Sequence, residues 1–514
     1  MNYRKKIILL IIISSALRLL FASATELGAD EVYYWTYALK LQWNYFDHPP
    51  LVAWLIRLTT VNLSFHSELF VRLGAIISSA ICTWLIFKLG TLINNFRAGW
   101  FAALLYTSSI YCSITAGANI LPDSPQMIFW LSGILLLIKI SRLTDNIPKA
   151  DLLWLLFGLV SGLCIMSKVD GVFLWFGVIL YVLFINRDWL KYRGIYLSAI
   201  ITLIVVFPII IWNIQNNFIS YKFHSSRLSP LGSGMHLTGF IKAILQQIAV
   251  CNPVNFFITG TGLFLALKGK VPVVKREINL LLFVSLPLII VILIISLFRE
   301  TFAHWPGPAY SSLLILPAVN LASNPKNRAA NIPKVIKWAL AYLMMIALLQ
   351  IVTINYFPGT LSVQKQGPKT GANDLTLYTY GWKEIGGKFD SLYRSDVAKK
   401  TMPPNAPIIV TNWFPAASIE FYVASNTKQE VLGIGNVLNL HQYYWTNKYK
   451  KQLKDGDDAY YIVPSDAFYY RTSDEVKKCF KTEGAPFVIA EYRSGLICRY
   501  ISVFRMKGYL KNKK

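Results

Sequence analysis

The sequence predicts a polytopic α-helical membrane protein that carries a small α/β domain at its C-terminal end. Of its 514 residues, 54% are hydrophobic and only 15% are charged, whereas soluble globular chains carry about a quarter charged residues. The apolar residues gather in long uncharged runs, and the mean hydropathy is +0.44. From about residue 355 onward, Gly, Pro, Lys and Asp become more frequent and no further long apolar run follows. We therefore expect a membrane domain over residues 1–354 and a second domain over residues 355–514.

The apolar runs predict about eleven membrane spans, since one span needs about 20 apolar residues. The first run follows Arg4, Lys5 and Lys6 and has no clear cleavage site after it, so we expect a retained span with a cytoplasmic N-terminus rather than a signal peptide. The expected spans cover residues 7–24, 68–88, 99–117, 125–141, 152–167, 170–186, 195–214, 238–267, 278–298, 306–322 and 334–354.

The formal net charge of +25 arises largely from Lys and Arg in short loops between the spans. Such loops face the cytoplasm according to the positive-inside rule, so we expect no nucleic-acid partner. The opposite face, periplasmic or extracellular, is then expected to hold the loops around Asp30 and Asp123, the turn 167–171, the loops 216–239 and 298–308, and the C-terminal domain. The cytoplasmic face is expected to hold Arg97 and the runs 142–149, 187–193, 268–276 and 326–337.

The first outer loop predicts two short amphipathic helices that lie in the membrane interface. Residues 31–42 carry Val32, Trp35 and Leu39 on one stripe, and a second helix is expected to begin at Pro49 or Pro50. Trp and Tyr in this loop are typical of the aromatic belt at a membrane surface.

The C-terminal segment predicts a small α/β domain of about 150 residues. Cys479 and Cys498 lie in this segment, and the sequence leaves open whether they pair in an oxidising compartment. The expected elements are strands at 408–410 and 460–463, a hairpin formed by 487–492 and 496–503 around Ser494-Gly495, and helices at 415–423 and 473–480.

Asp30 is the first candidate for catalysis. An acid just beyond a membrane span is able to act as a general base on an incoming hydroxyl or amine. The alternative is that Asp30 caps the following helix while Glu31 complements the helix dipole in its first turn. The position alone does not decide between the two.

Asp47 and His48 precede two prolines and form a second acidic element. Asp ahead of Pro is common in turns and helix starts, whereas an acid beside an imidazole is also suited to binding a phosphate or a metal.

Further ionisable residues follow in later outer turns. Asp123 is expected to cap the next span, with a role in the site as the alternative. Lys168 either extends to the interface, with Asp170 neutralising it, or binds an anionic ligand there. His304 lies beside Trp305, and Arg227 adds positive charge on the same face.

Together these residues indicate a lipid-phosphate-linked substrate. Such a donor requires a base for the acceptor, cations for the departing phosphate and an apolar groove for the lipid. The sequence has no evident Walker loop, GxGxxG, GxSxG or HExxH pattern, which removes support for nucleotide hydrolysis, dinucleotide redox chemistry, serine hydrolysis and zincin chemistry.

Five stretches carry a resemblance to a known group. The chain resembles the bacterial GT-C glycosyltransferases of the protein-mannosyltransferase-like superfamily (families 39 and 83), which includes the lipid A aminoarabinose transferase. The matching stretches are DEVYYWTYALKLQWNYFDHPPLVAWLIRL, LPDSPQMIFW, LCIMSKVDG, FAHWPGPAY and, less specifically, YTYGWKEIGGKF.

The resemblance implies roles for individual residues. It makes Asp30 the catalytic base and Glu31 its companion, and it makes Asp123 a second acid of the site. Asp47-His48-Pro49 stands where the aminoarabinose transferase has Glu-Lys-Pro contacting metal and phosphate. Because His48 carries charge only conditionally, a divalent metal stays open. Lys168 and His304 match motifs that we interpret as contacts to the donor phosphate.

We therefore expect an inverting glycosyltransferase of the inner membrane. It would move a sugar from a polyprenyl-phosphate donor to a lipid such as lipid A, a glycan or a protein on the outer face. The alternative is a transporter or flippase of a lipid-linked sugar, although transporters place ionisable groups near the midplane, often in repeated halves. The interpretation requires Asp30, Asp47 and Asp123 to converge on one chamber just beyond the hydrocarbon. It gives neither the sugar nor the oligomeric state.

Overall fold

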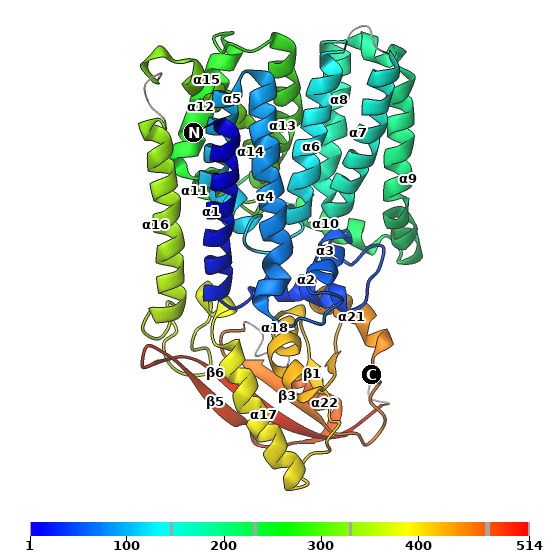
Figure 1. The fold of residues 1–514 in the computed structure, drawn as a ribbon. Coiled ribbons are helices and arrows are strands. Elements are labelled where there is room, and N and C mark those ends of the chain that lie inside the picture. Colours follow the sequence, from blue (N-terminus) through cyan, green and yellow to red (C-terminus); the bar gives the residue numbers. More distant parts are fainter. Residues whose placement is uncertain (1, 144–146, 230–233, 328–331, 468–472, 512–514) are drawn as a thin grey trace. The chain divides into compact units, whose positions relative to one another are not determined.

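The computed structural model describes residues 2–143, 147–229, 234–327, 332–467 and 473–511. It divides into two compact units (Figure 1). One comprises the chain up to Ala22 together with Leu41–Ala347, and the other comprises Ser23–Lys40 and Leu348–Lys514. The predicted loops 142–149, 216–239 and 326–337 lie partly outside the described residues.

The first unit is a bundle of helices that lie side by side (Figure 1). Its α-helices are α1 (Tyr3–Ala24), α3 (Leu51–Thr59), α4 (Glu68–Ile93), α5 (Phe96–Ser108), α6 (Asp123–Ser141), α7 (Ile147–Ser167), α8 (Phe173–Phe184), α9 (Arg193–Gln215), α10 (Ile219–Leu228), α11 (Leu237–Cys251), α12 (Pro253–Leu267), α13 (Lys275–Ser296), α14 (Gly307–Leu313), α15 (Ile315–Ser323) and α16 (Lys334–Tyr356). A π-helix, η1 (Tyr111–Thr115), and three 3₁₀ turns, η2 (Val169–Val172), η3 (Arg187–Lys191) and η4 (Pro325–Asn327), complete it.

Among the described residues, seven helices are long and apolar enough to cross a membrane. They are α1, α4, α6, α7, α9, α13 and α16, and an eighth span results if α11 and α12, bent by 104°, count as one. The chain is thus a multi-pass membrane protein, with seven or eight candidate spans where the sequence predicted about eleven.

The difference arises in three predicted spans that are helical but short or interrupted. In 99–117, helix α5 ends at Ser108 and a separate π-helix follows. Segment 170–186 contains the end of the 3₁₀ turn η2 and the 12-residue helix α8, and segment 306–322 divides into α14 and α15 at Leu314. A count of apolar residues does not reveal such breaks, because apolar composition is the same on both sides of them.

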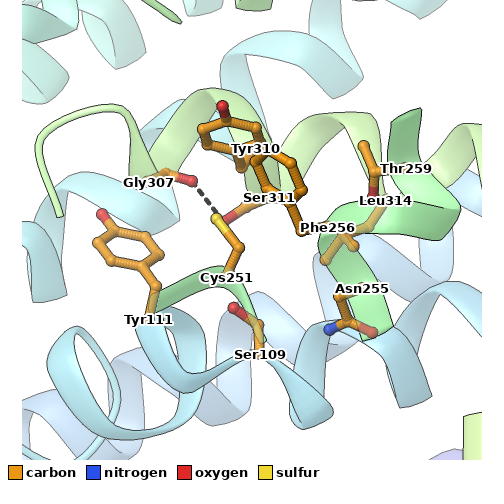
Figure 2. A pocket seen from close by; sticks show the side chains of 10 residues that line it. All are labelled: Ser109, Tyr111, Cys251, Asn255, Phe256, Thr259, Gly307, Tyr310, Ser311 and Leu314. Carbon is orange, nitrogen blue, oxygen red and sulfur yellow. Dashed lines mark hydrogen bonds between the residues drawn. The ribbon is translucent and has the colours of Figure 1, made fainter. Parts of the chain in front are cut away.

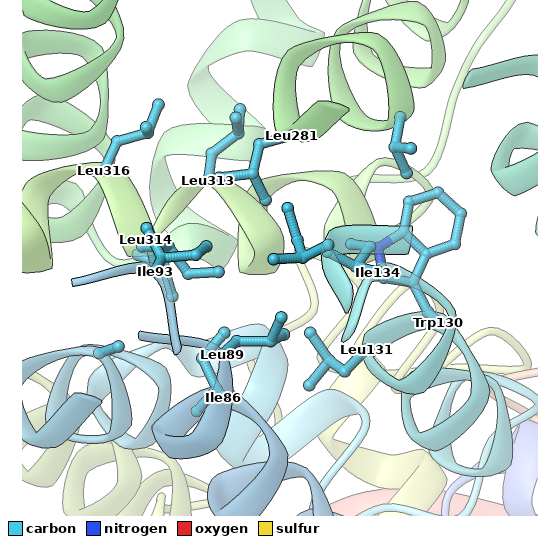
Figure 3. Close-up of a cluster of buried hydrophobic side chains, with 14 of the residues drawn as sticks. Ile86, Leu89, Ile93, Trp130, Leu131, Ile134, Leu281, Leu313, Leu314 and Leu316 are labelled. Carbon is cyan, nitrogen blue, oxygen red and sulfur yellow. The ribbon is translucent and has the colours of Figure 1, made fainter. Parts of the chain in front are cut away.

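The bundle core joins α4, α6, α13, α14 and α15 (Figure 3). Trp130 of α6 is fully buried and donates its indole N–H to Ser312 Oγ at 2.7 Å. In a lipid environment this packing stabilises the bundle through close contacts and interhelical hydrogen bonds, because lipid is as apolar as the core itself. The side chains labelled in Figure 3 are Ile86, Leu89, Ile93, Trp130, Leu131, Ile134, Leu281, Leu313, Leu314 and Leu316.

The second unit is built on a six-stranded mixed sheet of order β2-β1-β3-β6-β4, with β5 also paired to β6. Strand β1 runs parallel to β2 and β3, while β6 is antiparallel to β3, β4 and β5. The strands are β1 (Ile408–Val410), β2 (Val431–Gly433), β3 (Ala459–Pro464), β4 (Phe480–Glu483), β5 (Phe487–Arg493) and β6 (Leu496–Tyr509). The helices are α2 (Ala29–Leu39), η5 (Leu375–Thr379), α17 (Trp382–Ala398), α18 (Trp413–Ser418), η6 (Ile419–Ala424), α19 (Ser425–Thr427), α20 (Val437–Leu440), α21 (Tyr443–Thr446), η7 (Asn447–Tyr449) and α22 (Ser473–Lys478).

The predicted strands of this unit are confirmed, including the hairpin at Ser494-Gly495, where Arg493 pairs with Leu496. The predicted helix 415–423 is present as α18 followed by the π-helix η6, and α22 covers most of 473–480. Helix α17 and strands β2 and β4 were not predicted. Cys479 and Cys498 are both free thiols in the structure.

Both predicted helices of the first loop are present, but they belong to different units. Helix α3 begins at Leu51 directly after Pro50 and packs in the first unit, against α4. Helix α2 packs against α18 in the second unit. The predicted division at residue 354 did not foresee that 23–40 pack with the C-terminal residues.

Candidate functional site

A buried ion pair between Lys168 and Asp123 forms the centre of the candidate site in the first unit. Asp123 is the first residue of α6, and Lys168 lies between α7 and η2. Lys168 Nζ donates to Asp123 Oδ1 at 3.0 Å and Oδ2 at 3.1 Å. Burial lowers the pKa of Lys168, but the carboxylates of Asp123 and Asp170 outweigh it, so its pKa lies above the ordinary value. Lys168 is therefore a fixed cation.

Tyr111 gives the Asp123 carboxylate a second donor. Its phenol in η1 donates to Asp123 Oδ1 at 2.8 Å. Asp123 is therefore held by two side chains, and the residue before α6, Pro122, supplies no side-chain cap. The expectation that Asp123 serves mainly as a helix cap is thus replaced by a role in the buried cluster.

Asp170 is a secondary partner of Lys168, with its Oδ2 3.8 Å from Nζ. Its Oδ1 accepts a hydrogen bond from Gln126 Nε2 of α6. The predicted neutralisation of Lys168 by Asp170 is therefore weaker than its pairing with Asp123, which lies 45 residues away in the chain. The sequence analysis singled out neither Tyr111, which lies outside the quoted stretches, nor Gln126, which lies within LPDSPQMIFW.

His48 and His304 lie within electrostatic range of the same pair. Burial lowers the pKa of His48 to about 4, against the opposing charge of Asp47, and Lys168 and Asp123 also act on it. Burial lowers the pKa of His304 to about 4 as well, with Asp123 and Lys168 acting in opposite directions. Both imidazoles are therefore neutral at pH 7, and each offers hydrogen bonds rather than a charge.

Asp47 is attached to α10 through its backbone. His224 Nε2 donates to the Asp47 carbonyl at 2.9 Å, and the rings of His224 and His48 are 6.3 Å apart. The sequence analysis did not single out His224. The DHPP stretch is also a helix start, as its alternative interpretation predicted, because Pro50 directly precedes α3.

Arg227 of α10 is exposed, and its guanidinium contacts two aromatic rings near the site. Its guanidinium lies 5.3 Å from the centre of the Phe223 ring and 5.5 Å from that of Phe302. The Phe302 ring in turn stacks on His304 at 5.9 Å. Arg227 is thus connected to His304 by way of Phe302.

A small pocket lies next to this cluster (Figure 2). The ring of Tyr111 forms one wall, opposite α14, where Ser311 Oγ donates to the Gly307 carbonyl at 2.8 Å. Tyr310 donates from its phenol to Gln247 at 2.8 Å. The lining is rich in hydroxyl and amide groups: Ser109, Tyr111, Cys251, Asn255, Phe256, Thr259, Gly307, Tyr310, Ser311 and Leu314.

Asp30 and Glu31 stand in the first turn of α2, in the second unit. Glu31 Oε2 accepts the Gly28 backbone N–H at 2.9 Å, and the helix begins after Gly28. The capping role therefore belongs to Glu31, and Asp30 is an exposed residue beside it. The two units are described separately, so the convergence of Asp30 with Asp47 and Asp123 stays a prediction.

In the described part of the chain, no group of three His, Cys, Asp or Glu side chains is arranged to hold a metal ion. We therefore derive no step of the reaction through a divalent metal.

Comparison with known proteins supports the resemblance. Residues 47–212 match the family described as dolichyl-phosphate-mannose-protein mannosyltransferase. The lipid A galacturonosyltransferase RgtD of Rhizobium johnstonii is 23% identical over 57% of this chain, and the match spans 60% of that relative's length. The predicted resemblance is confirmed. The chain is related to the GT-C glycosyltransferases of the protein-mannosyltransferase type.

Solved structures show the same fold. ArnT from Cupriavidus metallidurans bound to undecaprenyl phosphate superimposes with a TM-score of 0.61 at 15% identity, covering 96% of this chain and 97% of ArnT. The mycobacterial arabinofuranosyltransferase AftD gives a TM-score of 0.53 at 14% identity, covering all of this chain and 40% of AftD. The present chain therefore has the GT-C fold.

The region matched to the mannosyltransferase family contains four of the candidate residues. Asp47, His48, Asp123 and Lys168 fall within 47–212. Asp30 and Glu31 precede that region, while Arg227 and His304 follow it. The central pair of the site is thus inside the segment that carries the family likeness.

Proposed function

We propose that this protein is a glycosyltransferase that moves a sugar from a polyprenyl-phosphate donor to lipid A. The observation that carries the proposal is the buried Lys168–Asp123 pair, which provides a fixed cation inside the family-matched region. The family match, the RgtD relative and the GT-C fold support a lipid-linked donor.

In this proposal Lys168 stabilises the phosphate that leaves when the sugar is transferred. A phosphate gains negative charge as the bond to the sugar breaks, and a preorganised cation lowers the barrier most in a site that excludes water. His48 and His304 donate N–H groups as neutral imidazoles, and Arg227 adds a charge at the exposed side. Asp123 keeps Lys168 protonated and oriented until the donor arrives.

Asp30 is proposed as the general base, with Glu31 fixing the start of its helix. The acceptor hydroxyl loses its proton to the Asp30 carboxylate while its oxygen bonds to the anomeric carbon. The polyprenyl phosphate leaves with the electron pair of the broken bond, so the anomeric centre inverts. The exposure of Asp30 to solvent supports this role.

Lipid A is proposed as the acceptor on the basis of RgtD, whose name gives that substrate. A hydroxyl group of a glycan or of a protein could accept the sugar by the same reaction. The test below distinguishes these acceptors from lipid A. We also propose that the site and the second unit lie on the periplasmic side of the inner membrane. The Lys and Arg of the opposite loops support that orientation.

The test is the mass of lipid A from bacteria that express the chain. We expect a new lipid A species whose added mass identifies the sugar, and Lys168→Ala should lower its amount by about 100-fold. If lipid A keeps its mass while envelope glycans or glycoproteins gain one, the acceptor is wrong and the transferase proposal holds. If none gains mass while lipid-linked sugar reaches the outer leaflet, the flippase alternative is correct.

A further inference from the structure

The stretch YTYGWKEIGGKF, residues 378–389, has no part in the proposed chemistry, yet its surroundings are unusual. It contains the start of α17, a 17-residue helix that begins at Trp382. The residue before it, Gly381, has no side chain with which to cap the first free N–H groups of the helix. These groups are satisfied by a residue from the other end of the chain.

That residue is Glu26, in the segment that leads into α2. Glu26 Oε2 accepts the Trp382 N–H at 2.7 Å, and Oε1 accepts the Lys383 N–H at 3.0 Å. Its backbone N–H also donates to the Thr379 carbonyl at 3.3 Å. A carboxylate at a helix N-terminus is favoured by both the hydrogen bonds and the helix dipole. Glu26 therefore fixes the chain four residues before Asp30.

The next residue is fixed by a different side chain. The Leu27 N–H donates to the phenol oxygen of Tyr422 in η6 at 2.7 Å. The Tyr422 carbonyl lies against Gly386 of α17, where a Cβ would meet it at 2.1 Å. The second glycine of the stretch thus allows α17 and η6 to approach closely, and together they hold residues 26 and 27.

Helix α2 itself packs against other residues of the second unit. The ring of Tyr33 lies 4.9 Å from that of Trp413, and its phenol oxygen accepts the Gln442 N–H at 3.1 Å. Trp35 meets Phe421 edge to face at 4.8 Å. The turn that carries Asp30 is therefore held on both sides, by Glu26 before it and by Tyr33 after it.

Residues 378–389 also contact a buried arginine. The Arg499 guanidinium lies 4.5 Å from the centre of the Trp382 ring and pairs with Glu491 and with Asp466, the latter at 3.0 Å. Arg499 is fully buried, so its contact with the Trp382 ring helps to hold the start of α17 in place.

We propose that residues 378–389 form a socket for Glu26, and that through it the C-terminal unit positions Asp30. Glu26 is a positioning residue that acts on the reaction only through Asp30. The inference rests on the proposed role of Asp30 as general base.

The experiment uses the full-length protein and four variants: Glu26→Gln, Glu26→Asp, Asp30→Asn, and Asp390→Asn as control. Asp390 lies in α17 directly after the socket and pairs with Arg394 at 2.9 Å. Two quantities are measured: hydrogen–deuterium exchange of residues 26–39 in detergent, and the fraction of lipid A that gains the sugar mass in expressing cells.

We expect Glu26→Gln to accelerate exchange across 26–39 and to lower sugar addition by about tenfold or more, because small displacements of a reacting group reduce rates steeply. Glu26→Asp should restore part of both. Asp390→Asn should change neither.

Two outcomes would overturn the inference: unchanged exchange in Glu26→Gln, or faster exchange with full sugar addition. Full activity of Asp30→Asn would contradict the proposed function instead, because Asp30 would then not be the base. The attachment of α2 by Glu26 would still be tested by hydrogen–deuterium exchange.

Discussion

The ammonium group of Lys168 donates to both carboxylate oxygens of Asp123, at 3.0 and 3.1 Å, and both side chains are buried. We predict that Lys168→Ala lowers sugar addition by about 100-fold, the usual effect of losing a preorganised donor of charge stabilisation. Loss of one partner of a buried pair also costs about 3–5 kcal/mol of stability. Thermal unfolding in detergent must therefore accompany the lipid A measurement.

A double variant separates folding from catalysis. Lys168→Met combined with Asp123→Asn removes both charges of the pair together, so it should unfold at a higher temperature than Lys168→Ala and still add no sugar. The control is Lys191→Ala, which removes an exposed lysine paired with Asp188 and should leave activity unchanged. An active double variant would show that the pair serves structure alone.

Tyr111→Phe tests the second donor to Asp123. The variant keeps the ring that walls the pocket and removes the hydrogen bond of 2.8 Å to Oδ1. Hydrogen bonds to charged groups contribute about 1.5–3 kcal/mol, so we expect a fall of about tenfold or more in sugar addition. Tyr310→Phe, which loses a bond to Gln247 instead, is the matched control. Equal losses in both variants would contradict a specific role for Tyr111.

The two partly buried histidines, His48 and His304, predict a loss of stability in acid. The pKa of His48 is about 4 in the folded protein and about 6.5 when exposed. The unfolded chain therefore binds a proton that the folded chain does not, and stability falls as the pH drops from about 6.5 to 4. Protonation of one such histidine lowers the free energy of unfolding by about 3 kcal/mol over this window. The same holds for His304, whose pKa is also lowered to about 4.

Measurement of the unfolding temperature between pH 7 and pH 4 checks this prediction. His48→Gln should reduce the slope, whereas His236→Gln, at an exposed position, should leave it unchanged. A slope that stays the same in His48→Gln would show that His48 protonates freely in the folded state.

Substitutions of two glycines, Gly381 before α17 and Gly387 within it, should change the stability in opposite directions. Gly381 has φ of +80°, and a Cβ there would lie 1.1 Å from Glu491 Oε1, so Gly381→Ala should destabilise the protein by several kcal/mol. Gly387 lies inside the helix with open space around its Cα, so Gly387→Ala should stabilise it by about 0.5–1 kcal/mol. Chemical denaturation of the full chain measures both. Similar effects of the two substitutions would contradict this account of the cap.

The sequence predicted what depends on local pattern. Apolar runs indicated the helices of the bundle, and β-rich stretches indicated most strands of the second unit. Lys168 and Asp123 were both recognised as candidates, but their pairing was not, because it joins two turns 45 residues apart. Tyr111 was missed because it stands in a π-helix inside an expected span. The attachment of α2 to the C-terminal unit was missed for a similar reason: Glu26 and Trp382 meet only through the fold.

The central claim is that a carboxylate at position 30 takes the proton of the acceptor. The most direct measurement compares sugar addition to lipid A by wild type, Asp30→Asn and the control Asp390→Asn, a helical aspartate of the same unit paired with Arg394. Each variant must be expressed at equal level and must unfold at the wild-type temperature. We predict that Asp30→Asn falls to background while Asp390→Asn retains full activity. Full activity of Asp30→Asn would contradict the account.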